Sequence, residues 1–232
     1  MMSQPSVQGD ARQRRLYGRR RGRPLRTGQR ALFETLLPSL RFSLDPSRKL
    51  DPRDLFDPAP REIWLEAGFG AGEHLAWQAE TQPQHGLIGS EVFEPGIARL
   101  LAEISSRHLG NVRLFPDDAR LLIANLVPES LARVFILFPD PWPKERHKKR
   151  RIVATETLDD LAVAMRADAE LRIATDDLDY AQWIDERLAA HQAFATLDLA
   201  ERPADWPATR YENKALAQGR RARLFRYRRR PR

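Results

Sequence analysis

Between residues 61 and 191 the chain alternates short apolar runs, rich in β-branched and aromatic residues, with longer segments whose apolar residues recur at helical spacing. The short runs predict buried strands, and the longer segments predict amphipathic helices. Strands are predicted at 62–66, 86–91, 111–115, 134–138 and 171–176, and helices at 72–80, 96–107, 119–126, 156–166 and 178–191. Such alternation is typical of an α/β protein with a parallel sheet, which binds ligands beyond the carboxyl ends of its strands.

The rest of the chain sets the domain organisation. The 232 residues suit one domain with tails. Residues 1–30 contain nine arginines and one aspartate and lack apolar periodicity, which predicts a basic, flexible N-terminal arm. We therefore expect a single domain over residues 31–232, with a short helix near residues 30–37 and a basic C-terminal end.

Composition excludes several classes of protein. The absence of cysteine excludes a disulfide scaffold and a cysteine-based zinc site, and it fits the reducing cytoplasm. The five histidines lack metal-ligand spacing, and no apolar stretch approaches the length of a membrane span. We expect a cytoplasmic protein with no metal and no membrane contact, and nothing in the sequence requires a protein partner.

Positive charge is concentrated in three clusters, although the net charge is only +7. Residues 1–30 form the first, residues 144–151 supply six cations against one glutamate, and residues 220–232 supply eight arginines and no acid. The remaining residues are net acidic. An acidic body with localised basic clusters indicates a polyanion held on one side of the domain; basic tails that only aid solubility are the alternative.

A glycine-rich loop follows the first predicted strand and opens the next helix. Gly68, Gly70 and Gly72 would let the backbone turn tightly and approach a ligand closely. Glu91 ends the second strand, 23 residues after Gly68, where a carboxylate can accept hydrogen bonds from both hydroxyls of a ribose. These features predict an adenosine-containing cofactor, either a nicotinamide dinucleotide or S-adenosylmethionine.

Acidic residues around the loop favour S-adenosylmethionine. The glycines are spaced G-x-G-x-G rather than G-x-G-x-x-G, and Glu66 and Glu73 would repel a pyrophosphate but attract the positive groups of a sulfonium amino acid. Asp118, in the loop after the third strand, is placed to accept a hydrogen bond from the adenine amino group. A turn role is the alternative for Asp118.

Phe-Pro-Asp-Pro-Trp-Pro-Lys, residues 138–144, ends the fourth strand in a rigid corner. Pro139 and Pro141 restrict the backbone on both sides of Asp140, and Trp142 and a run of cations follow. A fixed carboxylate, an indole and a phosphate-binding segment at a strand end suggest chemistry on a nucleic-acid base. Taken alone, an acid between two prolines is more often a turn residue.

Together these segments resemble the bacterial tRNA (guanine-N7-)-methyltransferase family, whose members modify guanosine 46 in the tRNA variable loop. The similarity runs in order from about residue 62 to residue 227. It comprises Glu-Ala-Gly-Phe-Gly-Ala-Gly-Glu-His-Leu at 66–75, Ile-Gly-Ser-Glu-Val-Phe-Glu-Pro-Gly at 88–96, Phe-Pro-Asp-Pro-Trp-Pro-Lys with Arg-His-Lys-Lys-Arg-Arg at 138–151, Ala-Thr-Asp at 174–176, and Arg-Pro followed by Thr-Arg-Tyr-Glu within 202–212. The resemblance implies a Rossmann-like class I methyltransferase fold, with a mostly parallel seven-stranded sheet and helices on both faces.

The resemblance also implies roles for individual residues, with Asp140 as the catalytic residue. The S-adenosylmethionine site would comprise Glu66, Gly68, Gly70, Gly72, Glu91, Asp118 and Asp140. Residues expected to contact the substrate are Lys144, Asp176, Thr209, Arg210, Tyr211 and Glu212, and those expected to contact RNA are Arg146, His147, Lys148, Lys149, Arg150 and Arg151.

Methylation of guanine N7 would make modest chemical demands on these residues. N7 has a free lone pair, so it needs no general base before it attacks a methyl group. Asp140 would act by positioning and by stabilising the positive charge that passes to the purine. Two alternatives stay open. One is a methyltransferase of exocyclic amines, whose acid-Pro-Pro-aromatic motif differs from Asp140-Pro141-Trp142, and the other is a noncatalytic RNA-binding protein on the same fold.

Overall fold

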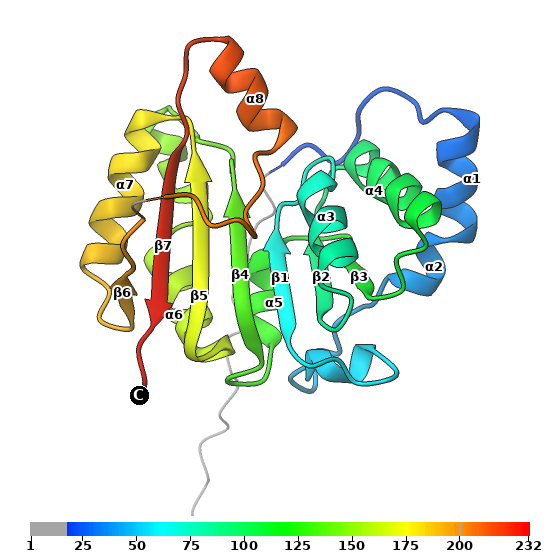
Figure 1. The fold of residues 1–232 in the computed structure, drawn as a ribbon, viewed down its shortest axis with the longest axis horizontal. Coiled ribbons are helices and arrows are strands. Elements are labelled where there is room, and N and C mark those ends of the chain that lie inside the picture. The colour runs from blue at the N-terminus through cyan, green and yellow to red at the C-terminus, as the bar shows by residue number, and fades with distance from the viewer. Residues whose placement is uncertain (1–17, 200) are drawn as a thin grey trace, which may run out of the picture.

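The computed structural model describes residues 18–199 and 201–232, which form one seven-stranded sheet flanked by helices (Figure 1). The strands lie in the order β3-β2-β1-β4-β5-β7-β6, and every pairing from β3 to β5 is parallel. β7 pairs antiparallel with both β5 and β6. The strands are β1 (Ile63–Ala67), β2 (Gly86–Ser90), β3 (Val112–Phe115), β4 (Leu131–Leu137), β5 (Met165–Thr175), β6 (Phe194–Thr196) and β7 (Arg223–Arg229). The predicted fold class is confirmed.

Helices cover both faces of the sheet because its central strands are apolar on both sides. One face carries α1 (Thr27–Thr35), α2 (Leu37–Leu40), α3 (Glu73–Thr81) and α4 (Glu94–Arg107), and the other carries α5 (Ala119–Asn125), α6 (Thr155–Ala164) and α7 (Leu178–Ala189). The other helical segments described are the 3-10 helices η1 (Pro52–Leu55) and η2 (Glu145–Arg150), and α8 (Arg210–Ala217). In β4, Val134 and Ile136 belong to the core shared with α5 to α7, whereas Phe135 and Leu137 belong to the core shared with α3 and α4.

The elements predicted between β1 and α7 occur in their predicted order, but several boundaries differ: β4 begins at Leu131 rather than at residue 134, and the largest difference is at the start of β5. The helix predicted over 156–166 ends at Ala164, and β5 begins at Met165. Met165 lies opposite Leu131 at the start of β4, and Glu170 lies opposite Arg133. Pairing with a neighbouring strand therefore decides the conformation of this stretch, and a local helical pattern does not reveal such pairing.

The C-terminal basic segment contributes a strand to the sheet. Phe225, Tyr227 and Arg229 alternate along β7 and are buried, as expected for one face of a strand. Arg226 forms an ion pair with Glu170 of β5. Part of the third basic cluster is thus engaged within the protein, which reduces the charge that this cluster presents on the surface.

The predicted N-terminal arm is described only from Gly18 onward, because residues 1–17 lie outside the described part of the chain. The main-chain oxygen of Arg20 accepts a hydrogen bond of 2.9 Å from the amide of Glu94 at the start of α4. The Arg20 side chain also pairs with Asp117 at 3.0 Å. This segment therefore runs along the domain before α1, which begins at Thr27 rather than near residue 30.

Candidate active site

A cavity of about 660 Å³ opens at the carboxyl edge of the sheet, where β1 and β4 are neighbours. The chain order reverses there, since β2 and β3 lie on one side of β1 whereas β4 and β5 lie on the other. Open parallel sheets bind ligands at such a switch point, because the loops on its two sides diverge. Predicted site residues that line the cavity are Glu66, Gly68, Gly70, Glu91, Asp118, Asp140, Arg150, Thr209, Arg210 and Tyr211.

The glycine loop has a backbone shape that side chains rarely tolerate. Gly68, Gly70 and Gly72 have φ angles of 76°, 58° and 78°. Gly72 is not in the cavity wall; a Cβ atom there would lie 2.6 Å from Cβ of Leu100. Two of the three glycines therefore lie where a ligand can reach them, and the third allows α3 to pack against α4.

Glu91 holds the glycine loop in place as well as lining the cavity. Its carboxylate accepts hydrogen bonds from the amides of Gly70 at 2.8 Å, Val92 at 2.7 Å and Phe93 at 2.9 Å. Burial raises the pKa of the Glu91 carboxyl, and the three amides only partly offset this effect. Oε2 accepts the Gly70 bond and has a second lone pair, so it can also accept a hydrogen bond from a ribose hydroxyl.

Glu66 lies buried at the end of β1, beside a histidine of α3. Its Oε2 is 2.7 Å from Nδ1 of His74, and the two side chains are 2% and 3% exposed. The His74 ring packs edge-on against Phe135 of β4, with 4.6 Å between ring centroids. A carboxylate buried to this degree requires such a partner, because burial without one is unfavourable.

Asp118 caps α5 and is held by an arginine. Its carboxylate accepts a hydrogen bond of 3.0 Å from the amide of Arg120 and forms an ion pair with the Arg120 guanidinium. The neighbouring Asp117 pairs with Arg20 of the N-terminal segment. Asp118 therefore lies in the cavity wall, and the Arg120 guanidinium partly neutralises the charge of its carboxylate.

The corner that carries Asp140 contains two bulky residues in the left-handed region. Phe138 has a φ of 52° and Trp142 a φ of 47°. Aromatic residues adopt this region rarely, and such strain persists only where the surrounding structure enforces it. Asp140 lies between them, exposed and in the cavity wall.

Arg151 does not fit its predicted role in RNA contact. Its side chain is 0% exposed, its Nε donates to the main-chain oxygen of Pro141 at 2.8 Å, and its guanidinium forms an ion pair with Asp179 of α7. A buried side chain bonded within the protein cannot also reach a phosphate on the surface. Arg151 therefore serves the structure of the corner.

The other cations that follow the corner differ in their surroundings. Lys148 pairs with Asp179 at 3.1 Å. The Trp142 ring lies 4.9 Å from the Arg150 guanidinium and 6.0 Å from the His147 ring, so these side chains form one group beside the cavity. The exposed members of the cluster are Lys144, Arg146 and Lys149.

The residues at the start of α8 cover the cavity from the other side. Thr209 caps the helix by accepting a hydrogen bond of 3.1 Å from an amide of its first turn. The amide of Arg210 donates to Glu73, at the start of α3, at 3.0 Å. The Tyr211 ring is 5.2 Å from that of Phe138. These contacts join the segment to both the glycine loop and the Asp140 corner.

Three predicted substrate residues lie outside the cavity wall. Asp176 pairs with Arg220 at 3.2 Å, and Glu212 pairs with Arg202. Lys144 is exposed beside the corner. The carboxylates of Asp176 and Glu212 are already paired with arginines, so direct contact with a bound nucleotide would compete with these ion pairs. Lys144 is accessible.

Several residues of the cavity wall had no sequence signal of their own. Gly18 and Arg19 of the N-terminal segment line the cavity, and so does Arg120, which forms an ion pair with Asp118. His74 had a usable signal, since it lies eight residues after Glu66 across a strand end and the first turn of a helix. The positions of Gly18, Arg19 and Arg120 depend instead on tertiary packing rather than on a local motif.

The polar groups of the cavity suit a sulfonium nucleoside better than a dinucleotide. Glu66, Glu91 and Asp118 place three carboxylates around the glycine loop, where a pyrophosphate would be repelled.

Across residues 18–199 and 201–232, no group of three or more His, Cys, Asp or Glu side chains is arranged to hold a metal ion. Over the same residues, no helix has both the length and the apolar character that crossing a membrane demands.

Comparison with known proteins agrees with this geometry. A family model described as "Putative methyltransferase" matches residues 60–224. The tRNA (guanine-N(7)-)-methyltransferase of Paramagnetospirillum magneticum is 52% identical over 224 residues, with 94% of each chain covered. The protein of the same name from Rhodospirillum rubrum is 46% identical over 226 residues, with 94% of this chain and 89% of the relative covered.

Solved structures agree on the fold. A 16S rRNA (adenine(1408)-N(1))-methyltransferase from Catenulisporales acidiphilia, solved with cosubstrate SAM, aligns with a TM-score of 0.56 over 82% of this chain and 93% of its own. The two share 17% sequence identity, so this likeness concerns the fold alone. The family match and the identity to the bacterial relatives show that this chain belongs to the tRNA (guanine-N7-)-methyltransferase family.

Proposed function

We propose that the protein transfers the methyl group of S-adenosyl-L-methionine to N7 of guanosine 46 in the variable loop of tRNA. One observation carries the proposal: the Asp140 corner, the glycine loop and the start of α8, which are far apart in the sequence, line a single cavity. Relatives with 46% and 52% identity bear the name of this activity. Position 46 is supported by the resemblance of the motifs, and a tRNA substrate is consistent with action in the cytoplasm.

Three carboxylates are available to hold the methyl donor. When bound, S-adenosylmethionine supplies an electrophilic methyl group on a positively charged sulfur. Glu91 would accept a ribose hydroxyl, and Asp118 would accept the adenine amino group. Glu66 would attract the positively charged amino-acid end. The close approach of backbone at Gly68 and Gly70 would leave room for the nucleoside.

Asp140 acts in this proposal as a positioning and electrostatic residue. The N7 lone pair attacks without prior loss of a proton, so no side chain has to act as a base. Alignment of the acceptor with the methyl group lowers the barrier, because a bimolecular step becomes effectively unimolecular. Positive charge moves onto the purine during transfer, and a carboxylate held in the cavity wall stabilises it.

Side chains beside the corner would hold the RNA. The exposed cations Lys144, Arg146 and Lys149 would contact phosphates, which contributes salt-dependent affinity but no base selection. Trp142 and Tyr211 offer aromatic faces in the cavity wall, and unstacked bases of RNA loops bind to such faces. Selection of guanine would then come from polar groups nearby, of which Thr209 and Arg210 are the nearest candidates.

The test is to incubate an unmodified tRNA transcript with methyl-labelled S-adenosylmethionine and to identify the product by nuclease digestion and mass spectrometry. We expect a single 7-methylguanosine at position 46, and no product from a matched transcript with adenosine at that position. Methylation of an exocyclic amine would support the first alternative enzyme. Tight tRNA binding without methyl transfer or donor binding would instead support a noncatalytic RNA-binding protein.

A further inference from the structure

A buried chain of hydrogen bonds connects Glu66 in the cavity wall to Asp205, in the segment before α8. Nδ1 of His74 lies 2.7 Å from Glu66 Oε2, and its Nε2 lies 3.2 Å from Nε2 of Gln78. Gln78 Nε2 in turn donates to the main-chain oxygen of Asp205 at 2.8 Å. Residues Glu66, His74 and Gln78 are 2%, 3% and 0% exposed, so water does not compete for these bonds.

The chemistry of the partners fixes where the hydrogens lie along this chain. The main-chain oxygen of Asp205 can only accept, so the Gln78 side chain presents its NH2 group to it rather than its oxygen. The same NH2 group faces Nε2 of His74, which must therefore accept and carry no hydrogen. The ring hydrogen is then on Nδ1 and is donated to Glu66. His74 is thus a neutral donor that orients the Glu66 carboxylate.

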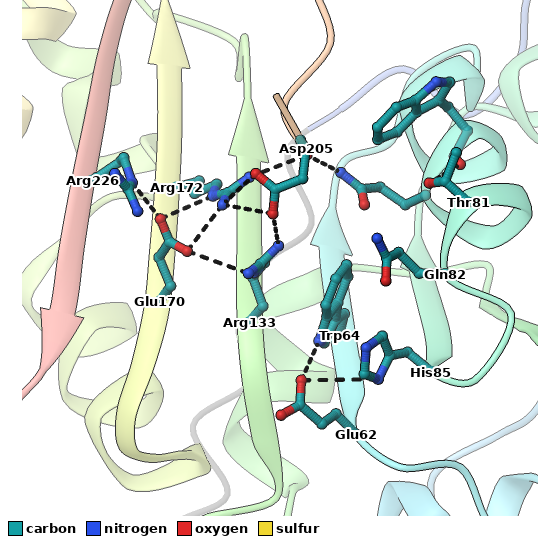
Figure 2. A network of polar contacts seen from close by, with 12 residues as sticks. Glu62, Trp64, Thr81, Gln82, His85, Arg133, Glu170, Arg172, Asp205 and Arg226 are labelled. Atoms are coloured by element: carbon teal, nitrogen blue, oxygen red, sulfur yellow. Dashed lines mark hydrogen bonds and ion pairs between the residues drawn. The ribbon is translucent and has the colours of Figure 1, made fainter. Parts of the chain in front are cut away.

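Asp205 is itself held by two arginines of the sheet. Figure 2 shows its carboxylate between Arg133 of β4 and Arg172 of β5. The carboxylate oxygens lie 2.6 Å from a guanidinium nitrogen of Arg133 and 2.9 Å from one of Arg172. The next residue, Trp206, is buried, with its ring 5.4 Å from the Arg172 guanidinium. The backbone that leads from Asp205 to Thr209 is therefore anchored on the sheet. The series of hydrogen bonds that begins at Glu66 thus ends at a fixed point.

We propose that His74 and Gln78 are positioning residues for methyl transfer. His74 holds Glu66 in the orientation that binds the donor, and Gln78 connects the same histidine to the segment that carries Thr209 and Arg210. This inference rests on the proposed function for the identity of donor and substrate. Hydrogen-bond partners of a binding residue commonly set its orientation, and their loss weakens the site.

The first test measures S-adenosylmethionine binding by calorimetry in the absence of tRNA. His74→Phe keeps an aromatic ring against Phe135 but removes the donor to Glu66. We expect its Kd for S-adenosylmethionine to rise at least about tenfold, as for loss of a hydrogen bond to a charged group. His74→Asn keeps an NH near the Nδ1 position but leaves a gap against Phe135. It should bind the donor more tightly than His74→Phe although it unfolds at a lower temperature.

A matched control exists at the opposite edge of the sheet. His85 precedes β2 and is 6% exposed; its ring stacks on that of Trp64 with 4.6 Å between centroids, and its Nδ1 lies 3.9 Å from Glu62 Oε2. Figure 2 shows His85 beside these two residues. His85→Phe should leave the donor Kd within about twofold of wild type. Equal weakening of donor binding by His74→Phe and His85→Phe, or an unchanged Kd in His74→Phe, would overturn the proposal.

The second test separates the two ends of the chain. Gln78→Met removes the amide and keeps a side chain of similar length. We expect it to leave the donor Kd within about twofold while kcat/KM for tRNA falls at least about fivefold, because the bond to Asp205 is lost. An unchanged kcat/KM would refute the role of Gln78. If the wild-type protein binds S-adenosylmethionine but does not methylate tRNA, the proposed function fails, whereas the donor-binding series still decides the role of His74.

Discussion

Nε of Arg151 donates to the main-chain oxygen of Pro141 at 2.8 Å, so a buried cation fastens the residue that follows Asp140. The same guanidinium pairs with Asp179 and lies 4.7 Å from the Tyr180 ring. The corner after β4 is therefore held rigidly from inside the domain. This explains how the positive φ angles on both sides of Asp140 can persist.

Arg151→Met should destabilise the corner without changing how phosphates are bound. The variant leaves the Pro141 oxygen without its buried donor, and we expect the free energy of unfolding to fall by about 1–3 kcal/mol. Methylation should fall with it, whereas the slope of log affinity for tRNA against log salt should stay unchanged. Lys149→Ala, in an exposed cation of the same cluster, should instead reduce that slope by about 0.7–0.9 if one phosphate contact is lost. A reduced slope in Arg151→Met would mean that the side chain leaves its buried place to bind RNA.

Asp140→Asn should abolish most methyl transfer in a protein that stays folded. Asp140 is exposed, so the change removes its charge with little effect on packing. Loss of one electrostatic contact to a transition state typically lowers kcat about 100-fold or more. Single-turnover rates at saturating donor and tRNA give the measurement, and thermal unfolding gives the control. Near-normal rates would reduce Asp140 to a turn residue.

Gly96→Ala should weaken donor binding by moving the glycine loop. A Cβ atom at Gly96, on α4, would lie 2.1 Å from the main-chain oxygen of Gly70, a contact that backbone cannot accept without shifting. We expect the Kd for S-adenosylmethionine to rise more than tenfold in calorimetry. Gly110→Ala is the matched control, because nothing lies within 4 Å of its Cβ position. Unchanged donor affinity in Gly96→Ala would show that the donor does not contact this loop.

Glu170→Gln should make the protein less sensitive to acid. Burial would raise the pKa of Glu170, but hydrogen bonds and charge from Arg172, Arg226 and Arg133 outweigh it and hold the pKa below its ordinary value. A lowered pKa contributes stability that is present above the ordinary value, about 4.3, and is lost as the pH falls through the folded-state value. The variant should therefore be less stable than wild type at pH 7, with a difference that shrinks below about pH 4. Urea unfolding between pH 7 and pH 3 measures this, with the exposed Glu34→Gln as control. A constant difference across that range would contradict the expectation.

The central part of the fold was predictable because its signals are local. From β1 to α7, each strand and each helix has its own local pattern of apolar residues. Residues at strand ends, such as Glu66 and Glu91, meet at one edge of the sheet because the strands are parallel. The position of β7 was not predicted from the sequence. Phe225 and Tyr227 alternate with arginines there, and an arginine-rich segment is equally typical of a basic tail.

The remaining errors in the site have one physical cause. Arg151 cannot be told from the exposed cations beside it in sequence, since only its ion pair with Asp179 distinguishes it. Asp205 likewise acts through partners on other elements. Contacts of this kind arise when elements pack, so local pattern does not reveal them.

The antiparallel pairing of β6 with β7 has a consequence for loop closure. Thr196 lies opposite Tyr227, so the chain between these strands leaves and returns at neighbouring points of the sheet. Once both ends of a loop are held, each doubling of its length adds only about 0.6 kcal/mol of closure entropy. Asp205 and the start of α8 are themselves held to the domain, but the connections between these fixed points, such as residues 218–222 between α8 and β7, can gain or lose residues with little penalty to the sheet. The part of the cavity wall that α8 supplies thus tolerates insertion at these connections, whereas the glycine loop and the Asp140 corner lie at the ends of buried parallel strands.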